Sequence, residues 1–333
     1  MPLPDATAVG PQPFGALDPQ TLLAALDAVG FATDGRLQAL NSFENRVYQV
    51  GLDDSPPVIA KFYRPGRWSD AQIIEEHAFL AELVDDEVPV VAPLARDGVT
   101  LHHADGLRFA VFPRQGGRAP ELDRPGAIEQ MGRFLARTHV VGGRAPFAER
   151  PALSVDDYGR QPLAELAASE RIPPESAPVY LALAAQALDA AEIAWQRAGT
   201  PRRLRLHGDC HLGNVLWTDG GPHFVDFDDS RQGPAIQDLW MLLSGDHADQ
   251  ERQLAALLAG YETFREFDRA ELHLVEALRT LRLIHHAAWI ARRWDDPAFP
   301  PAFPWFESPR YWEARILELR EQIAALDEAP LSA

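Results

Sequence analysis

Strand-like patterns are concentrated in the first third of the chain, and helix-like patterns fill most of the remaining two thirds. The segments 46–50 and 57–62 alternate or run apolar around an Asp-Asp-Ser-Pro turn, which predicts a β-hairpin. The spacing of apolar residues predicts helices at 21–29 and 69–84, the second with Ser69 as its N-cap. Three further short strands are predicted at 90–94, 99–102 and 107–112.

Beyond residue 112 the apolar periodicity becomes helical. The Pro- and Gly-containing segment 113–118 predicts a hinge, and a Thr-Asp-Gly-Gly turn predicts a hairpin within a β insertion at 203–229. The sequence therefore predicts an α+β fold with a small β-rich lobe, 1–112, and a larger, mostly helical lobe, 119–333. The first lobe is expected to open with a loose arm at 1–18. Six helices are predicted in the second lobe, at 124–140, 178–197, 234–243, 248–266, 268–293 and 308–326.

Charge and composition exclude some classes of function. The chain has 49 Asp and Glu against 31 Lys and Arg, and the net charge of −18 argues against nucleic acid as a partner. No apolar run is long enough to cross a membrane, and the first residues lack the features of a secretory signal. The single cysteine, Cys210, excludes an intrachain disulfide. We therefore expect a cytoplasmic protein with no membrane partner, whose acidity serves solubility or suits a cationic substrate or a divalent metal.

One basic residue stands apart from the others. Lys61 is the only lysine, and every other member of the 31 Lys and Arg residues is arginine. An ammonium group is a compact charge on a flexible stem, which suits it to reach a phosphate group where a planar guanidinium would not fit. Lys61 is therefore a candidate ligand of phosphate, the alternative being an ordinary surface charge.

Polar residues are densest in the segments 206–216 and 223–229. A hairpin whose strands end at Asn214 and Asp226 would bring these two side chains together, with Asp209 beside them in the preceding loop. Carboxylate and amide oxygens are the ligands that Mg²⁺ prefers. A separate carboxylate can accept the proton of a hydroxyl group and orient its oxygen. The pattern predicts metal-assisted transfer chemistry, with Asn214 and Asp226 as metal ligands and with Asp209 and Asp226 as catalytic residues.

The same residues resemble the kinase pattern His-Arg-Asp-x₄-Asn followed by Asp-Phe-Gly. The step from Asp209 to Asn214 matches it, whereas Gly208 stands in place of the arginine and Asp228 in place of the glycine. Lys61 ends a Val-Ile-Ala-Lys segment that is close to the Val-Ala-Ile-Lys strand of kinases, where the lysine holds the nucleotide phosphates.

A lysine with this task needs a carboxylate partner on the following helix, and Glu75 and Glu76 compete for the role. Glu76 lies on the apolar stripe of the helix, whereas Glu75 points about 100° away. We therefore choose Glu76, and we expect Glu75 and Glu82 to be solvated. The residues that define the stripe are Ile73, Leu80 and Leu83.

The loop that would cover the phosphates is the weakest part of the pattern. Residues 41–46 lie between two predicted strands and contain no glycine, so a Gly-x-Gly-x-x-Gly cradle is absent. Ser42 can still donate its hydroxyl and its backbone N–H to a phosphate, and the alternative is a plain turn former.

Together these strings resemble the aminoglycoside phosphotransferase and choline kinase-like branch of the protein kinase fold and, within it, the stress response kinase A family, also called the YihE protein kinase family. The resemblance implies a two-lobed kinase fold and an ATP- and Mg²⁺-dependent serine/threonine kinase, monomeric and cytoplasmic, that acts in the stress response. It implies Asp209 as catalytic base, Asn214 and Asp226 as Mg²⁺ ligands, and Ser42 at the ATP phosphates. The strings are Asn41 to Tyr48, Lys61 to Pro65, Arg205 to Asn214, Val225 to Asp228 and Gln237 to Leu243.

Other polar residues near these strings have structural interpretations. His207 and His211 are expected to brace the catalytic loop, and Asp238 to hydrogen-bond its backbone. Cys210 is expected to be a buried, inert thiol. Asp228 and its neighbour Asp229 either add a second metal contact or stay solvated.

Three functions remain open from the sequence. The first is phosphoryl transfer to a serine or threonine of a protein. The second keeps the chemistry but takes a small alcohol such as an amino sugar, choline or a homoserine-like compound, and acidic residues near the site would suit a cationic acceptor. The third is a pseudokinase, which the combination of Lys61, Asp209, Asn214 and Asp226 argues against.

Overall fold

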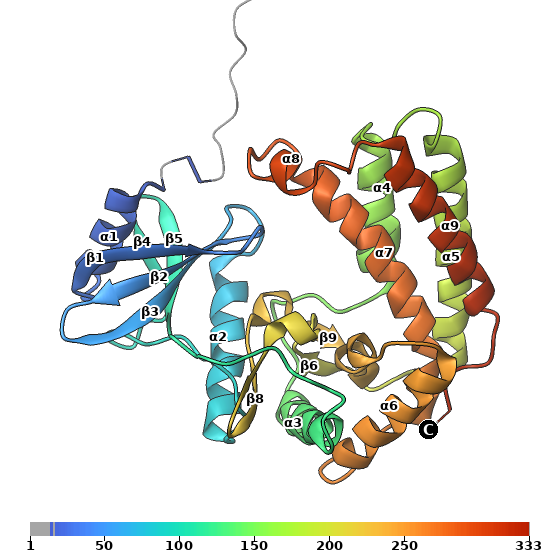
Figure 1. Cartoon of the computed structure of the whole chain (residues 1–333), viewed down its shortest axis with the longest axis horizontal. Coiled ribbons are helices and arrows are strands. Elements are labelled where there is room, and N and C mark those ends of the chain that lie inside the picture. The colour runs from blue at the N-terminus through green and yellow to red at the C-terminus, as the bar shows by residue number, and fades with distance from the viewer. Residues whose placement is uncertain (1–13, 16, 333) are drawn as a thin grey trace, which may run out of the picture. The chain divides into compact units, whose positions relative to one another are not determined.

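A computed structural model describes residues 14, 15 and 17–332 of the chain (Figure 1). The predicted loose arm at 1–18 therefore lies mostly outside the described residues. The chain divides into two compact units. The sheet unit contains Met1–Ile74 and Ala92–Arg114, and the helical unit contains Glu75–Val91 and Gln115–Ala333. The predicted boundaries at residues 112 and 119 remain predictions.

The sheet unit is built on a five-stranded antiparallel sheet in the order β1-β2-β3-β5-β4 (Figure 1). Its strands are β1 (Thr33–Leu40), β2 (Arg46–Leu52), β3 (Ser55–Phe62), β4 (His102–Ala104) and β5 (Leu107–Pro113). The predicted hairpin of β2 and β3 is confirmed. Helix α1 (Pro19–Ala28), capped by Asp18, packs apolar residues against the same core as the sheet.

Two of the predicted strands are wrong. Segment 90–94 forms no strand, and only an isolated bridge joins Val90 to Phe224 within the helical unit. Pro89 and Pro93 explain this, since a proline has no N–H to offer a sheet ladder. Segment 99–102 reaches the sheet only at its last residue, where β4 begins.

Helix α2 (Asp70–Asp85) agrees with the predicted helix at 69–84. The Ser69 hydroxyl accepts from the N–H of Gln72 at 3.2 Å, and the Gln72 side chain accepts from the N–H of Ser69 at 2.9 Å. This reciprocal capping box satisfies two backbone donors at the start of the helix. The boundary between the two units falls within α2, after Ile74.

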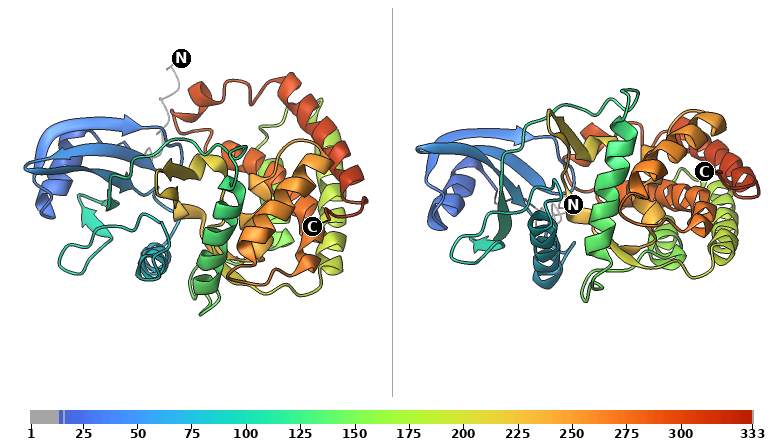
Figure 2. Two further views of the ribbon diagram at one scale, coloured as in Figure 1. Left: turned by 60° about the horizontal axis from the view of Figure 1, so that its bottom comes forward. Right: turned by 90° about the horizontal axis from the view of Figure 1, so that it is seen from below.

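The helical unit contains two groups of packed helices. Helices α4, α5, α7 and α9 lie side by side, and α3 packs against α6 (Figures 1 and 2). At the second contact Gly132 and Gly260 leave no room for a side chain, because an added Cβ would meet a backbone oxygen of the facing helix at 2.0 Å and 1.9 Å. The helices are α3 (Ala127–Gly142), α4 (Gln161–Ala168), α5 (Ala177–Arg197), α6 (His247–Tyr261), α7 (Val275–Arg292), α8 (Phe299–Ala302) and α9 (Pro309–Ala325). No helix of the described residues has the length and apolar character that a membrane span requires.

One predicted helix is wrong, and two helices, α4 and the four-residue α8, were not predicted. Segment 234–243 forms two short 3₁₀ turns, Ala235–Asp238 and Trp240–Leu242, instead of an α-helix. Gln237 and Asp238 of this segment hydrogen-bond to the loop that follows β6, and the backbone between them follows the positions of these bonds and not a regular helix. Helix α4 is preceded by a π-helical turn at Asp156–Arg160, and its apolar pattern is too short to stand out in the sequence.

Four short strands form two small ladders in the helical unit. Strands β7 (Val215–Thr218) and β8 (Gly221–Phe224) form the predicted hairpin, with Thr218 paired to Gly221 at the turn. Strands β6 (Leu204–Leu206) and β9 (Arg231–Gly233) form the other ladder. The polar strings singled out in the sequence lie at the ends of these strands.

Candidate active site

Residues 207–214, the predicted catalytic loop and called the catalytic loop below, follow strand β6 and turn sharply at Gly208. Gly208 has φ +87°, and an added Cβ would lie 2.1 Å from the backbone oxygen of Asp229. Both the left-handed conformation and the close approach require glycine. This explains why the arginine of the kinase pattern cannot stand at this position.

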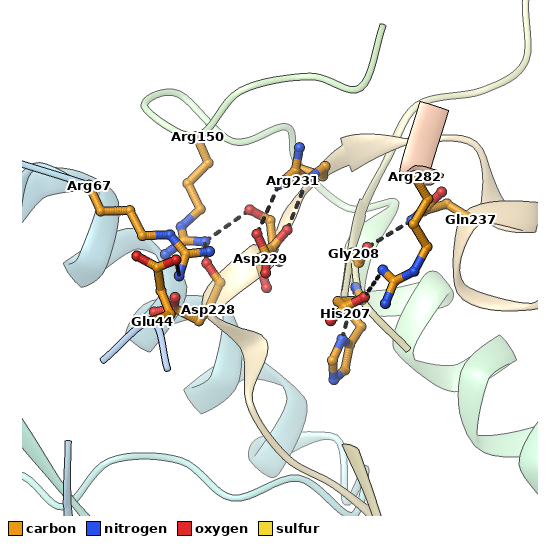
Figure 3. A network of polar contacts seen from close by, with 12 residues as sticks. Glu44, Arg67, Arg150, His207, Gly208, Asp228, Asp229, Arg231, Gln237 and Arg282 are labelled. Carbon is orange, nitrogen blue, oxygen red and sulfur yellow. Dashed lines mark hydrogen bonds and ion pairs between the residues drawn. The ribbon is translucent and has the colours of Figure 1, made fainter. Parts of the chain in front are cut away.

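A buried carboxylate holds the backbone of this loop. Asp238 is fully buried, and its two oxygens accept from the N–H groups of His207 and Gly208, both at 2.8 Å. His139 binds the same carboxylate at 3.1 Å. The Gln237 side chain donates to the carbonyl of Gly208 at 2.8 Å (Figure 3). The predicted role of Asp238 is confirmed, and the loop is fixed by side chains from the 3₁₀ segment that follows it.

His207 connects the loop to the segment after β8. Its Nδ1 accepts from the N–H of Asp209 at 3.3 Å, and its Nε2 donates to the carbonyl of Val225 at 2.9 Å. The imidazole is buried and contacts Phe227, with ring centroids 4.4 Å apart. The predicted bracing role of His207 is confirmed.

The carboxylate of Asp209 is flanked by the side chains of Arg282 and His211. Arg282, on α7, forms an ion pair with Oδ1, and Nε2 of His211 lies 3.5 Å from Oδ2. Burial opposes ionisation of Asp209, but the hydrogen bond with His211 and the charge of Arg282 outweigh it. The pKa of Asp209 is therefore held well below its usual range, and the carboxylate is ionised at neutral pH.

Asn214 and Asp226 lie beside this loop. The Asn214 amide donates from Nδ2 to the backbone carbonyl of Asp209 at 3.0 Å, and the N–H of Val225 donates to the carbonyl of Asn214 at 3.0 Å. Asp226 is exposed and adopts φ 62° and ψ 62°, a left-handed conformation that is uncommon outside glycine. Its backbone is thus fixed at a sharp turn directly after the segment that His207 and Asn214 hold.

The side chains of Asn214 and Asp226 have oxygen atoms that suit a divalent cation. The Asn214 amide nitrogen is used by the loop backbone, so its oxygen is the atom that can coordinate, and Asp226 supplies a carboxylate. An amide oxygen and a carboxylate are hard ligands of the kind that Mg²⁺ takes when it is shared with substrate phosphates. Asp228 is buried, so the expectation that it stays solvated is wrong. Asp229 forms an ion pair with Arg231 at 3.1 Å.

Glu76 is 1% exposed and forms an ion pair with Arg150 at 2.6 Å. Arg150 also donates to the carbonyls of Asp228 and Ser230 at 2.9 Å and 3.0 Å (Figure 3). The carboxylate on α2 is thereby connected to the segment after Asp226. The predicted pairing of Glu76 with Lys61, which belongs to the other unit, remains a prediction.

The expectation of a solvated charge is wrong for Glu75, whereas the side chain of Glu82 is 42% exposed but has a specific partner. Glu75 accepts from the backbone N–H groups of residues 148–150, at 3.0 Å and 2.8 Å for the last two. Glu82 binds Arg205 through two hydrogen bonds, and this pair lowers the pKa of Glu82. These partners lie more than 70 residues away in sequence, so helical periodicity gave no sign of them.

The remaining two candidates lie in the sheet unit. Lys61 is 7% exposed on β3, between Val47 of β2 and Ala110 of β5, and its Nζ lies 5.4 Å from the ring centroid of Tyr63. Ser42 is half-buried in the turn between β1 and β2. Arg64 braces that turn by donating to the carbonyls of residues 43 and 44 at 3.0 Å and 2.9 Å. Lys61 is thus paired on both sides within the sheet, and hydrogen bonds from Arg64 brace the glycine-free turn.

Cys210 is fully buried, and burial raises the pKa of its thiol well above the usual value. The prediction of a buried, inert cysteine is confirmed.

Sequence reasoning missed two arginines. Arg282 lies on the predicted helix 268–293, where its spacing gives no sign of a role, and Arg150 falls in a segment with no regular pattern. Only their contacts identify them. The partner of Arg282 lies 73 residues away along the chain, and the partners of Arg150 lie 74 to 80 residues away.

Comparison with known proteins agrees with the geometry. Residues 36–275 match the phosphotransferase enzyme family. Stress response kinase A of Escherichia coli K12 is 46% identical over 318 residues, which cover 96% of each chain, and serine/threonine protein kinase RdoA of Salmonella typhimurium LT2 has the same identity and coverage. Both relatives fall in the family that the sequence strings resemble.

Solved structures show the fold. Amicoumacin kinase hAmiN, in complex with AMP-PNP, Ca²⁺ and Ami, gives a TM-score of 0.71 at 20% identity and covers 95% of each chain. The microcompartment-associated aminopropanol kinase gives 0.66 at 21% identity, with 92% of this chain and 96% of that one covered. The predicted α+β kinase-like fold, with an antiparallel sheet and a helical part, is confirmed.

Proposed function

The chain belongs to the phosphotransferase enzyme family and is a kinase, and we propose that it is an ATP- and Mg²⁺-dependent serine/threonine protein kinase of the bacterial stress-response type. The observation that carries the proposal is the loop that presents an ionised Asp209 beside Asn214 and Asp226. The relatives named as stress response kinase and serine/threonine protein kinase support the choice of acceptor and of biological role.

Asp209 is the residue that receives the acceptor hydroxyl. With its pKa held low, it is a weak base in the ground state, so its main contribution is to orient the hydroxyl oxygen for attack. As the new bond between that oxygen and the γ-phosphorus forms, the bond to the β–γ bridging oxygen breaks and ADP leaves. The hydroxyl proton passes to Asp209. Arg282 and His211 stabilise the carboxylate until the proton moves.

Asn214 and Asp226 would hold the metal ion. When bound, Mg²⁺ would neutralise the negative charge that develops on the phosphates during transfer. The chain's own contribution is to fix these two ligands: the Asp209 carbonyl orients the Asn214 amide, and the left-handed turn at Asp226 sets the direction of its carboxylate. For Asp229 to make a second contact with the metal ion, its ion pair with Arg231 would have to break.

Lys61 and Ser42 would bind the nucleotide phosphates, with Glu76 as the partner of Lys61. The burial of Lys61 in the middle of the sheet supports this role, because a buried lysine is retained only with anionic partners. Since Glu76 already pairs with Arg150, a second cation at this carboxylate would share its charge between both.

The test is transfer from labelled ATP to a generic protein acceptor, a panel of small alcohols that includes amino sugars, choline and homoserine, and no acceptor. We expect label on the protein acceptor, dependence on Mg²⁺, and no transfer by Asp209→Ala. Label confined to a small alcohol would support the small-molecule kinase instead, and nucleotide binding without any transfer would support a pseudokinase.

The proposed enzyme is a monomer in the cytoplasm. Size-exclusion chromatography with light scattering tests the first expectation, and fractionation of cells tests the second.

A further inference from the structure

His139 is a fully buried histidine with a partner at each ring nitrogen. Its Nδ1 lies 2.8 Å from the hydroxyl of Tyr261, and its Nε2 lies 3.1 Å from Oδ2 of Asp238. Tyr261 and Asp238 are fully buried as well. The three side chains come from α3, α6 and the 3₁₀ turn at 235–238, and we call them the histidine network.

We propose that His139 is a positioning residue for phosphoryl transfer, which donates from Nε2 to Asp238 and so fixes the carboxylate that holds the catalytic loop. The proposal rests on the function proposed above, in which this loop carries the catalytic Asp209. It adds His139, and Tyr261 behind it, to the residues on which the reaction depends.

The surroundings of Tyr261 determine the direction of the two hydrogen bonds. Burial raises the pKa of Tyr261, so its hydroxyl keeps its proton at neutral pH and can donate it to His139. A hydroxyl that donates to Nδ1 requires this nitrogen to be unprotonated, and the proton of the neutral imidazole is then on Nε2. From Nε2 it is donated to Asp238, because an ionised carboxylate can only accept.

Asp238 needs this donor because its carboxylate is shielded from water. The N–H groups of His207 and Gly208 each donate to one of its oxygens at 2.8 Å, and Oδ2, which binds His207, also binds His139. No arginine or lysine among the described residues forms an ion pair with Asp238. A buried carboxylate in such a site depends on hydrogen bonds for its orientation. Loss of His139 should therefore loosen the carboxylate and, with it, the two residues that precede Asp209.

The close packing of α3 against α6 brings Tyr261 to His139. Gly260 precedes Tyr261, and an added Cβ there would lie 1.9 Å from the backbone oxygen of Glu129 on α3. Gly132 makes the equivalent close contact from α3, and His139 lies two turns further along the same face of that helix. The rings of His139 and Tyr261 have centroids 5.6 Å apart. The imidazole therefore connects the contact between the two helices to the catalytic loop.

The first experiment measures kcat and the KM for ATP. His139→Leu should lower kcat about tenfold and leave the KM within about twofold, because the loop is affected and the nucleotide site is not. His139→Gln places an amide N–H near the position of Nε2 and should restore most of kcat. Thr138→Val is the matched control, because it removes a buried hydroxyl that donates to the carbonyl of Phe134 on the same helix, and its kcat should be unchanged. Normal kcat in His139→Leu, or an equal loss in Thr138→Val, overturns the proposal.

A double-mutant cycle tests whether Tyr261 acts through His139. Tyr261→Phe should lower kcat about threefold in the wild-type background and should have no further effect in His139→Leu. Equal losses in the two backgrounds would show that Tyr261 acts independently of His139, and would overturn the network.

Two measurements without an acceptor separate this proposal from the proposed function. Nitrogen-15 NMR of histidine-labelled protein should show Nε2 of His139 protonated and Nδ1 unprotonated, with the signals assigned by their loss in His139→Gln. Amide hydrogen exchange at His207 and Gly208 should be about tenfold faster in Tyr261→Phe, which keeps the ring and its packing, and unchanged in Thr138→Val. These two results support the network even if no acceptor is phosphorylated, in which case the proposed function is what fails. A proton on Nδ1, or unchanged exchange in Tyr261→Phe, overturns the network.

Discussion

The five-stranded sheet and the catalytic loop are held in place by different kinds of contact. Between the sheet and α1, the core is apolar, with residues such as Phe62 and Phe109 fully buried and their rings 5.1 Å apart. The catalytic loop is held by hydrogen bonds from buried polar side chains, chiefly Asp238, Gln237 and His207. Apolar packing tolerates exchange of similar side chains, whereas a buried hydrogen bond depends on one atom in one position. Substitutions in the two regions should therefore affect different properties.

The largest effect is expected within the loop. Asp209→Ala and Asp226→Ala should each lower the transfer rate about 10²–10⁴-fold while the fold survives, because they remove the proposed orienting carboxylate and a proposed metal ligand. Asp226→Ala should also weaken binding of Mg·ATP, and Asp209→Ala should largely spare it. Single-turnover kinetics and nucleotide calorimetry measure the two effects. The control is Asp219→Ala, at the exposed turn of the β7–β8 hairpin, which should behave as wild type. Near-normal turnover by Asp209→Ala would contradict its catalytic assignment.

Asp238→Ala should combine loss of activity with loss of stability. It leaves the N–H groups of His207 and Gly208 without their acceptor, at about 1–3 kcal/mol each, so the free energy of unfolding should fall by roughly 2–6 kcal/mol. Phe109→Ala in the sheet should cost a similar amount, about 3–5 kcal/mol, by opening a cavity. Chemical denaturation compares the two. At a temperature where both variants are folded, only Asp238→Ala should lower kcat; an equal loss of kcat in both would contradict the comparison.

Lys61→Arg tests the nucleotide-binding role proposed for the lysine of the sheet. The charge is retained, but a planar fork cannot replace an ammonium group on a buried strand, so transfer should fall about tenfold to a hundredfold. Because Lys61 is the only lysine, an amine-reactive ATP analogue should label one internal position, and Mg·ATP should protect it. Full activity in Lys61→Arg, or free labelling of Lys61 in saturating Mg·ATP, would place the nucleotide elsewhere.

The smallest effect concerns pH. Burial raises the pKa of Glu271 to about 7, although its carboxylate accepts from the N–H of Ile236 at 2.9 Å. Between the usual value of 4.5 and about 7 the folded protein retains a proton that the unfolded chain has released, so stability falls as the pH rises through this window. Glu271→Gln should remove a fall of roughly 3 kcal/mol, measured by denaturation at a series of pH values. An unchanged pH dependence in this variant would assign the titration to another group.

The sequence by itself determined the elements whose signals are local. Alternation and turn chemistry predicted the β2–β3 and β7–β8 hairpins, helical spacing and a capping residue predicted α2, and the order of polar residues singled out Asp209, Asn214 and Asp226. Periodicity also favoured Glu76 over Glu75 for the buried position, and Glu76 is buried.

Only the tertiary structure decided which distant side chains meet. Arg282 reaches Asp209 across 73 residues, Arg150 reaches Glu76 across 74, and Asp238 reaches the catalytic loop across 30 and 31. Ion pairs and hydrogen bonds of this kind depend on distance in space, and a sequence pattern reports only spacing along a helix or strand. The 3₁₀ turns at 235–242 were mispredicted for the same reason, because the side chains that fix the catalytic loop, and not local propensity, set the backbone there.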